Sequence, residues 1–415
     1  MKRLVHRVAL YGYLGSGNLG NDASFETVLT WLRSEHPDVD VRCITIAPGE
    51  VVAKYGVPSA PLAWRSSGQG GSRMTVASRK LLGRLLDVPR TYTLTGTVDA
   101  VIVPGMGVLE ETLGVRPWGL PLWLFLTVAA CKLRNRRFVL LDVGAEWAAN
   151  PITRRLYVAT VRLATHVSYR DDASAAAMAR AGAREPETVA PDLAFAHPAP
   201  KVAKPEPGRL VVGVMAYYGP GDDPVRGADV RRKYVATMAD ALAKLAGEGT
   251  HIVLVGGDKA DVDVAQDVRA AVLTSCPGLS ENALLVRELT TFAELTEEMM
   301  RAEVIIASRF HNLICALRLA RPTVSVGYAG KNRHLMQAMG LDGYCQDIEH
   351  VDASQLVVQV RDARRYGDAL AARIRLCTSN YADEVKALLE RVARENLGLA
   401  AHQLSELDVR DEMAV

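Results

Sequence analysis

The sequence predicts an α/β protein with two Rossmann-like, doubly wound domains that face each other across a cleft. Its 415 residues are long for a single α/β domain and sufficient for two. Short runs of Val, Ile and Leu alternate with helix-like runs along most of the chain, a pattern that builds parallel sheets with right-handed crossovers. The alternation pauses over residues 197–208, where four prolines predict a stiff linker.

The first predicted domain comprises residues 1–196. Its strand-like runs are short and apolar, as expected of strands that are buried on both faces. They cover Val8–Tyr13, Val39–Ile46, Ala100–Val103, Phe138–Val143 and His166–Tyr169. Helical patterns lie between them, over Ala23–Ser34, Leu120–Leu133, Ile152–Ala164 and Ala173–Ala181.

The second predicted domain comprises residues 209–350. Strands are expected over Leu210–Tyr217, Ile252–Val255, Leu284–Val286, Val304–Ala307 and Thr323–Val326. Helices are expected over Val230–Leu245, Val262–Leu273, Phe292–Met300, Leu313–Leu319 and Lys331–Met339. A long helical segment, residues 351–396, follows, and a polar tail compatible with disorder occupies residues 397–415.

Composition excludes several classes of protein. Lys and Arg number 49 against 47 Asp and Glu, and this balance argues against a protein that coats nucleic acid. The six cysteines lack the spacing of zinc or redox motifs, and we expect them to be reduced in a cytoplasmic protein. The basic N-terminus is followed by a glycine-broken apolar segment, which is not the pattern of a signal peptide. The apolar stretch Pro117–Cys131 is too short to span a membrane, so we expect a buried helix there.

A glycine-rich loop, Gly12–Asp22, follows the first predicted strand and opens the first helix. Such loops let backbone N–H groups approach an anionic ligand at a helix N-terminus. A dinucleotide site would also need an acidic residue at the tip of the second strand, where the chain reads Ala47-Pro48 instead. Two readings remain: a tight turn, and a loop that shapes the floor of a site. Asn18 and Asp22 would contact a sugar hydroxyl there, or cap the helix.

Cationic side chains follow two neighbouring strands of the second predicted domain. Ser308, Arg309 and His311 come directly after one strand, and Lys331 and Arg333 come after the next. Because residues at the carboxyl ends of parallel strands point into the crevice of a doubly wound sheet, we expect one anion pocket there. Arg309 is suited to bidentate binding of a carboxylate or phosphate, and His311 is suited to acid–base work.

At these residues the sequence resembles the polysaccharide pyruvyltransferase family. The resemblance is carried, in family order across roughly residues 8–340, by the glycine loop, by Asp99–Gly107, by Ser168–Ser174, by Pro191–Ala194, by Ser308–His311 and by Lys331. The chain departs from the family pattern at Gly20-Asn21-Asp22, and Pro104 and Met106 interrupt the middle glycine run.

The resemblance implies a fold like that of GT-B glycosyltransferases and a pyruvyl transfer from phosphoenolpyruvate to a saccharide, with no metal and no further cofactor. It implies that His311 and Arg309 belong to the donor site. We assign His311 as the acid–base residue, and assign donor binding to Ser308, Arg309, Lys331, Arg333 and Arg170. We assign the acceptor to Gly17, Asn18, Asp22, Gly105, Glu110 and Glu146. Asp171 and Asp192 are further candidates for a carboxylate beside the reacting carbon.

Two alternative functions remain. A nucleotide-sugar glycosyltransferase would have much the same architecture, with Asp258 as a candidate ribose contact. Asp261 and Asp263 copy a metal-binding DxD pattern, but their place at a predicted helix start favours capping.

The second alternative is a non-catalytic protein that binds glycan or lipid at a membrane. Residues 73–90 mix arginines with leucines in an amphipathic pattern, which suits either an anionic bilayer or a solvated helix whose apolar side lies in the core. Peripheral membrane contact would also fit an enzyme with a lipid-linked acceptor.

Overall fold

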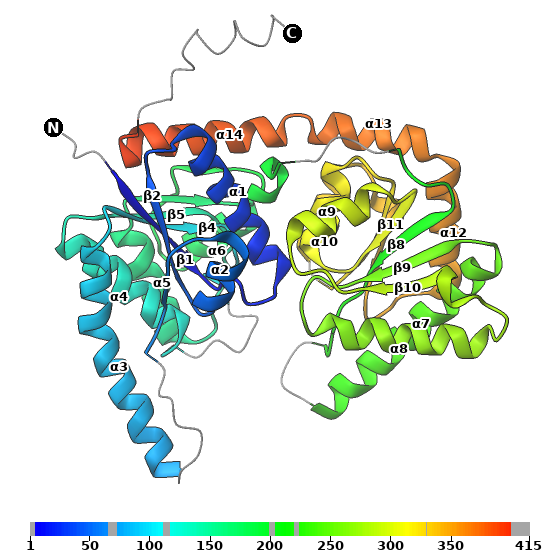
Figure 1. Cartoon of the computed structure of the whole chain (residues 1–415), viewed down its shortest axis with the longest axis horizontal. Coiled ribbons are helices and arrows are strands. Elements are labelled where there is room, and N and C mark those ends of the chain that lie inside the picture. The colour runs from blue at the N-terminus through cyan, green and yellow to red at the C-terminus, as the bar shows by residue number, and fades with distance from the viewer. Residues whose placement is uncertain are drawn as a thin grey trace, which may run out of the picture. The chain divides into compact units, whose positions relative to one another are not determined.

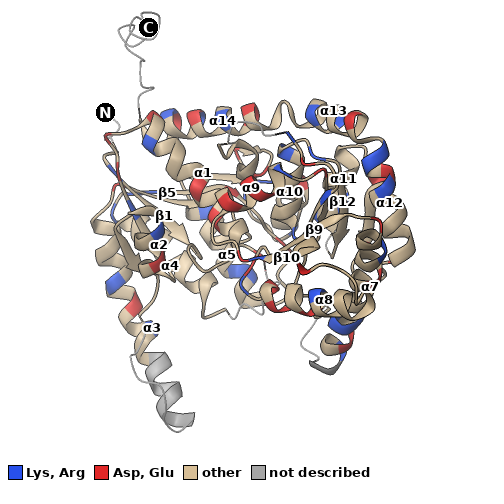
Figure 2. Cartoon of the chain, turned by 45° about the vertical axis from the view of Figure 1, so that its right-hand side comes forward, with Lys and Arg blue, Asp and Glu red and all other residues tan. Residues whose placement is uncertain are grey.

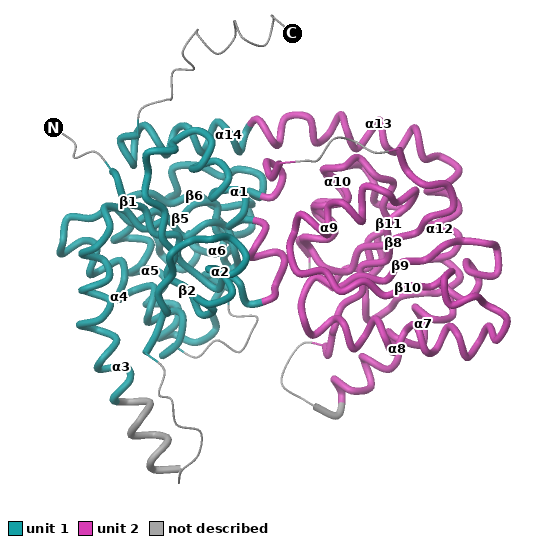
Figure 3. Tube along the Cα trace, viewed as in Figure 1, with its two compact units in different colours: residues 1–16, 24–193, 384–415 teal, residues 17–23, 194–383 magenta. Residues whose placement is uncertain are grey.

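The computed structural model describes residues 5–64, 73–110, 117–198, 204–219, 224–328 and 330–399, with the backbone alone for residues 73–81 and 224–225 (Figure 1). The chain divides into two compact units (Figure 3). Unit 1 comprises residues 1–16, 24–193 and 384–415, and unit 2 comprises residues 17–23 and 194–383. Each unit holds a parallel sheet with flanking helices, as the sequence predicts.

The described part of unit 1 contains a seven-stranded parallel sheet in the order β3-β2-β1-β4-β5-β6-β7. Its strands are β1 (Arg7–Gly12), β2 (Asp40–Thr45), β3 (Ser59–Pro61), β4 (Ala100–Pro104), β5 (Arg137–Val143), β6 (His166–Tyr169) and β7 (Thr188–Val189). The order reverses between β1 and β4, so their carboxyl ends flank the switch point where doubly wound sheets bind ligands.

The helices of unit 1 alternate with these strands. They are α1 (Leu19–Glu35), α2 (Pro48–Tyr55), α3 (Arg73–Gly96), α4 (Leu120–Leu133), α5 (Pro151–Leu163), α6 (Asp172–Arg180) and most of α14 (Tyr381–Arg391). The first residues of α1 belong to unit 2. The predicted buried helix corresponds to α4, with Leu124, Val128 and Cys131 fully buried.

The described part of unit 2 contains a six-stranded parallel sheet in the order β10-β9-β8-β11-β12-β13. Its strands are β8 (Arg209–Gly213), β9 (His251–Val255), β10 (Leu284–Arg287), β11 (Val304–Ala307), β12 (Thr323–Gly327) and β13 (Cys345–Asp347). Its helices are α7 (Pro224–Gly247), α8 (Asp261–Ser275), α9 (Phe292–Met300), α10 (Phe310–Arg318), α11 (Gly330–Ala338), α12 (Ala353–Arg365) and α13 (Gly367–Thr378).

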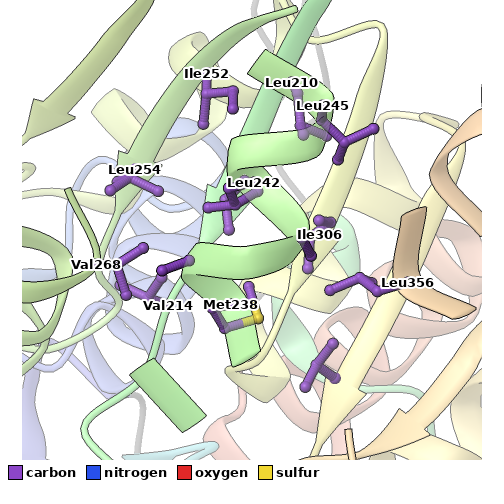
Figure 4. Packing of buried hydrophobic residues seen from close by; sticks show 14 of the residues in the cluster. Leu210, Val214, Met238, Leu242, Leu245, Ile252, Leu254, Val268, Ile306 and Leu356 are labelled. Atoms are coloured by element: carbon purple, nitrogen blue, oxygen red, sulfur yellow. The ribbon is translucent and has the colours of Figure 1, made fainter. Parts of the chain in front are cut away.

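Alternate residues of the unit 2 strands enter two different apolar cores. Leu210 and Leu254 pack with Leu242 of α7 on one face of the sheet (Figure 4). Val211 and Val253 pack with helices α9, α10 and α13 on the other face. Since successive strand residues point to opposite faces, runs such as Val-Val and Ile-Val are what a sheet covered on both sides requires.

Two segments group differently from the predicted domain boundaries. Residues 17–23 group with unit 2, although the sequence analysis placed them in the first domain, and residues from Glu384 onward group with unit 1. In the predicted linker, residues 199–203 lie outside the described part of the chain. The neighbouring Glu206 forms ion pairs with Arg209 and Arg301. Most of the predicted polar tail, residues 400–415, is likewise outside the described residues.

The six cysteine thiols are not joined in disulfides, and Cys43, Cys131 and Cys315 are buried. Among the described residues, no helix combines the length and the apolar character that crossing a membrane demands.

Candidate active site

The carboxyl ends of β8, β9 and β11 bring the most distinctive residues of unit 2 together. The order of the sheet reverses between β8 and β11, which makes this edge the switch point of unit 2. Ser308 follows β11, and its backbone N–H donates to the carbonyl of Gly213 at the end of β8, at 2.9 Å. Helix α10 begins two residues later, so its N-terminal N–H groups face the same edge.

Arg309 is held by a buried carboxylate. Its Nε donates to Oδ2 of Asp261 at 2.9 Å, and its Nη2 donates to Oδ1 at 2.6 Å. Burial opposes the charge, but the hydrogen bonds and the charge of Asp261 keep the pKa of Arg309 above its ordinary value. Within the described part of the chain, these bonds occupy one edge of the guanidinium. The two bonds use the Nε–H and one N–H of Nη2.

Asp261 also ties together the loops that follow two strands. Its side chain accepts from the backbone N–H of Ala216 and from that of Gly257, each at 2.8 Å. The residue is fully buried at the start of α8 and makes no capping hydrogen bond. The predicted capping role of Asp261 is therefore wrong. Its carboxylate instead orders the β8 loop, the β9 loop and Arg309.

Ser308 is fully buried, and its hydroxyl lies 3.0 Å from the hydroxyl of Tyr234 on α7. Burial raises the pKa of Tyr234 to about 12. The carbonyl of Ser308 accepts from the side chain of Asn332 at 3.5 Å. Ser308 therefore anchors the loop before α10 to the core.

The segment Gly17–Ala23 packs on the loop after β9. The N–H of Leu19 donates to the carbonyl of Gly257 at 2.9 Å, and Nδ2 of Asn18 donates to Oδ2 of Asp258 at 3.2 Å. Oδ1 of Asn18 accepts from the N–H of Gly20 at 3.0 Å, which caps the start of α1. Of the two roles predicted for Asn18, the structure shows the helix cap. Its amide nitrogen also bonds to Asp258, which lies far along the chain.

His311 lies against the first turn of α1. A Cβ built on Gly20 would stand 2.2 Å from Nδ1 of His311, so the imidazole needs a glycine at this position. Gly17 has a φ of +91°, and a Cβ there would stand 2.6 Å from the side chain of Lys259. The glycines of the N-terminal loop therefore make room for side chains of unit 2. Asp22 follows in the same turn and is fully buried.

The next strand-to-helix loop, after β12, carries the other predicted cations. Nζ of Lys331 lies 5.2 Å from the centre of the Phe310 ring, which links α11 to α10. Arg333 lines a small cavity of about 150 Å³ beside the ends of β12 and β13, together with Asn332 and Gln346. Both cations lie in the first turn of α11.

Asn312, one turn into α10, was not predicted from the sequence. Its amide is almost fully buried, and a Cβ on Gly213 or Gly257 would stand 2.5 Å from its Nδ2 or 2.9 Å from its Oδ1. The glycines at the ends of β8 and β9 therefore leave room for this amide beneath the site. Its place directly before the apolar run Leu313–Leu317 was the available signal.

A second group of titratable residues lies in unit 1 around Arg170. Arg170 follows β6, is almost fully buried and forms an ion pair with Glu110. Its Nη1 lies 3.5 Å from Oδ2 of Asp192, and its Nε lies 3.8 Å from Oδ2 of Asp171. Burial opposes the charge of Arg170, but these carboxylates, Glu110 foremost, raise its pKa.

Asp142, at the end of β5, adds a further carboxyl to this group. The residue is buried and has a φ of +57°, a left-handed conformation that costs free energy for a residue other than glycine. Burial, followed by the charge of Asp192, raises the pKa of Asp142 well above its usual range, although Arg170 acts in the opposite direction. The group therefore holds more carboxyls than its single guanidinium can neutralise.

Glycines shape the surroundings of Arg170. A Cβ on Gly107 would stand 2.5 Å from the carboxyl of Glu110, and one on Gly144 would stand 2.4 Å from Nη2 of Arg170. Gly105 has a φ of +54°, and a Cβ there would stand 2.3 Å from the hydroxyl of Ser24. Glu146 is exposed after β5.

The predicted site residues thus fall into two groups. Unit 2 gathers Ser308, Arg309, His311, Lys331 and Arg333, together with the loop residues Gly17, Asn18 and Asp22 that were assigned to the acceptor. Unit 1 holds Arg170, Gly105, Glu110 and Glu146. In the part of the chain that the structure describes, no three His, Cys, Asp or Glu side chains are grouped to hold a metal ion.

Solved structures share the fold at low sequence identity. A UDP-GlcNAc 2-epimerase from Neisseria meningitidis, bound to UDP-GlcNAc, has a TM-score of 0.57 at 9% identity and covers 94% of this chain and 100% of that one. The S. aureus protein MnaA with UDP has a TM-score of 0.58 at 11% identity, over 94% and 97% of the two chains. A glycosyltransferase from Rickettsia africae gives 0.57 at 10% identity, over 94% and 97%. These likenesses establish the two-domain GT-B fold.

The family model described as polysaccharide pyruvyl transferase matches residues 18–330. The match takes in the Gly17–Ala23 segment almost entirely, the Arg170 group, the loop from Ser308 to His311 and the start of α11. The chain belongs to the polysaccharide pyruvyl transferase family.

Proposed function

We propose that this enzyme transfers the pyruvyl group of phosphoenolpyruvate to two hydroxyls of a sugar in a polysaccharide or glycolipid. The product is a cyclic pyruvate ketal, and inorganic phosphate is released. Phosphoenolpyruvate is a co-substrate, and the proposal includes no metal and no other cofactor. The proposal rests on three cations, Arg309, Lys331 and Arg333, which follow the carboxyl ends of β11 and β12 in a chain of this family.

The donor carries a carboxylate and a phosphate, so its site needs several fixed cations. Arg309 is fixed by Asp261, and Lys331 and Arg333 lie in the first turn of α11. The N-termini of α10 and α11 add partial positive charge at the same edge of the sheet. We assign this edge of unit 2 to the donor, with Ser308 supporting Arg309 through the core.

Ketal formation proceeds by steps that these residues can assist. Protonation of the donor's methylene carbon gives a methyl group and an oxocarbenium ion at the neighbouring carbon. The first sugar hydroxyl adds to that carbon and loses its proton. The C–O bond to phosphate then breaks, a second oxocarbenium ion forms, and the second hydroxyl adds and loses its proton. One of the two released protons balances the one added to carbon, and the phosphate takes up the other.

His311 is the proposed acid–base residue, because its imidazole is the titratable group on the first turn of α10. Positioned acid–base groups contribute about 10²–10⁴-fold to rate. We therefore expect His311→Ala to lower turnover by that factor while donor binding persists. Unchanged turnover would remove His311 from the mechanism.

The acceptor is the less defined partner. We assign the saccharide to unit 1, where Gly105, Glu110 and Glu146 lie near strand ends and Arg170 holds Glu110. Arg170 is also the candidate from unit 1 for a contact with the donor. Because Gly17, Asn18 and Asp22 pack with unit 2, we now assign these three to shaping the donor side. A phosphoenolpyruvate donor further implies a cytoplasmic enzyme, and a lipid-linked saccharide would place it at the membrane face.

Calorimetric titration of phosphoenolpyruvate tests the proposal. We expect saturable binding to the wild type and loss of binding in Arg309→Ala, with Arg232→Ala as a matched control because Arg232 is highly exposed on α7. Candidate glycans are added in a second series, in case the donor binds only after the acceptor. Binding by neither protein in both series would contradict the donor assignment.

A nucleotide-sugar transferase is the alternative that the same titration examines. Its candidate ribose contact, Asp258, accepts from Asn18 with one oxygen and from the N–H of Ala260 with the other. These bonds leave Asp258 poorly placed for a ribose. Binding of UDP or GDP in the absence of phosphoenolpyruvate binding would replace the pyruvyl transfer by glycosyl transfer.

A further inference from the structure

Three leucines of helix α3 are turned outward. Leu82 is 51% exposed, Leu85 63% and Leu86 38%, and their spacing places them on one face of the helix. The opposite face packs inward with Gly83 and Asp87, both buried. An amphipathic helix on a soluble domain ordinarily turns its leucines inward. The sequence-based alternative in which the apolar side of this helix enters the core is therefore wrong for these three leucines.

The inward position of Asp87 fixes this orientation. Its Oδ1 accepts from the backbone N–H of Trp64 at 2.6 Å, and its Oδ2 accepts from Nε1 of Trp123 on α4 at 3.1 Å. A Cβ on Gly83 would stand 2.9 Å from the Trp64 ring, so the helix approaches this ring closely. Turning the leucines inward would break both of these hydrogen bonds and expose the buried carboxylate of Asp87.

Two cation–aromatic pairs involve side chains of α3. The Arg84 guanidinium lies 5.9 Å from the ring centre of Trp118, and Trp118 is itself 47% exposed just before α4. At the other end, the guanidinium of Arg134 lies 3.7 Å from the ring centre of Tyr92, which is also exposed. In Figure 2 the described turns of α3 are mostly tan, the colour of uncharged residues.

The sequence of helix α3 carries a net positive charge. Its sequence contains five Lys and Arg residues and a single acidic residue, Asp87, which is buried and bonded to the two tryptophans. Exposed leucines on a helix of net positive charge are typical of a helix that lies in the interface of an anionic bilayer. A surface for another protein copy would need acidic groups to meet these cations, and the described face of α3 offers none that is exposed.

We propose that the face formed by Leu82, Leu85 and Leu86 docks unit 1 on an anionic phospholipid bilayer. The leucines enter the boundary between headgroups and acyl chains, and the net positive charge of α3 attracts the helix to the lipid phosphates. The inference goes beyond the pyruvyl transfer and does not depend on the donor. Its consequence, delivery of the enzyme to a lipid-borne saccharide, does rest on the proposed function.

Co-sedimentation of the full chain with vesicles tests this surface in the absence of any substrate. We expect binding to vesicles of phosphatidylcholine with phosphatidylglycerol, weaker binding as salt rises, and little binding to phosphatidylcholine alone. The double variant Leu82→Ser/Leu85→Ser should bind at least tenfold more weakly. Arg84→Glu should bind about fivefold more weakly or worse. Absence of wild-type binding to anionic vesicles would overturn the proposal.

Matched controls come from α13, where Arg375 and Leu376 are exposed. Arg375→Glu and Leu376→Ser should leave vesicle binding unchanged, and equal losses in all variants would overturn the assignment to α3. Hydrogen exchange of the wild type needs no variant. Residues 82–92 should gain protection when anionic vesicles are added, and unchanged exchange there would contradict docking. A wild-type dimer that Leu82→Ser/Leu85→Ser converts to monomer, without vesicle binding, would show that this face covers a second copy.

Discussion

At the scale of single residues, two groups to which we assign no ligand contact position the side chains of the candidate donor site. Arg309 carries the positive charge, but Asp261 decides where it points, since it accepts from two guanidinium nitrogens and from two backbone N–H groups. Gly20 has a similar indirect role beside His311. Asp261 and Gly20 can each be replaced without changing any side chain that we assign to ligand binding.

Asp261→Asn should weaken phosphoenolpyruvate binding by ten- to a hundredfold, because an amide cannot accept from all four of these N–H groups. The loss of a buried acceptor should also lower the free energy of unfolding by about 1–3 kcal/mol. Titration calorimetry and urea unfolding measure the two effects. Asp263→Asn, an exposed neighbour on the same helix, is the matched control. Donor binding of wild-type strength in Asp261→Asn would refute the positioning role.

Gly20→Ala should lower kcat/KM by at least 10²-fold, because the new Cβ displaces the imidazole of His311. The backbone of Gly20 is helical, so alanine adds no backbone strain, and the imidazole can rotate away at a cost of about 1 kcal/mol. Gly49→Ala is the control, since Gly49 also lies in a first helical turn and a Cβ there meets nothing within 4 Å. Steady-state kinetics with the same activity in both variants would show that the position of His311 is unimportant.

At the scale of elements, a side-chain hydrogen bond from Asn18 to Asp258 links the start of α1 to the loop after β9. Asn18→Asp should keep the cap on α1 but place a carboxylate beside Asp258, which destabilises the protein by about 1–2 kcal/mol. Adding Asp258→Asn restores a donor and an acceptor in reversed order, and Oδ1 of the new side chain can still accept from Ala260. We expect the double variant to regain most of the lost free energy of unfolding. Additive losses in this double-mutant cycle would show that the bridge carries no coupling.

At the scale of the whole molecule, two buried acids should give the stability opposite dependences on pH. The pKa of Asp142 is raised in the folded state, so the folded chain binds that proton more tightly than the unfolded chain. Its contribution is favourable at low pH and is lost as pH rises from about 3.9, the unfolded pKa, towards the folded pKa. Asp142→Asn should therefore gain stability relative to wild type as pH rises.

Asp99 should give the stability the opposite dependence on pH. Although burial alone would raise its pKa, hydrogen bonds from the N–H groups of His6 and Arg7, and the charges of Arg7 and Arg136, lower it. Its contribution is present above about pH 3.9 and is lost as pH falls through its folded pKa. Asp99→Asn should lose stability at pH 8 and less at acidic pH, and urea midpoints measured from about pH 3 to pH 8 compare the two variants. An Asp142→Asn curve parallel to that of the wild type would contradict a raised pKa.

Periodicity predicted most of the fold because it is a local property. Runs such as Phe138–Val143 specify a strand buried on both faces wherever they lie, and the structure has β5 there. Three short edge strands, β3, β7 and β13, were not predicted, because two or three residues with few apolar side chains give no periodic signal. The turn of α3 towards solvent was not predicted either, since it depends on hydrogen bonds from Trp64 and Trp123 to Asp87.

The sequence by itself determined the two α/β units, the family, and the loop that places Ser308, Arg309 and His311 after a strand. These follow from adjacency and pattern within short stretches of chain. Only the tertiary structure decided that Asp261 orients Arg309, that Tyr234 bonds to Ser308 and that residues 17–23 pack with unit 2. Those contacts join residues tens to hundreds of positions apart. Their partners are chosen by the path of the chain between parallel strands, which no local pattern encodes.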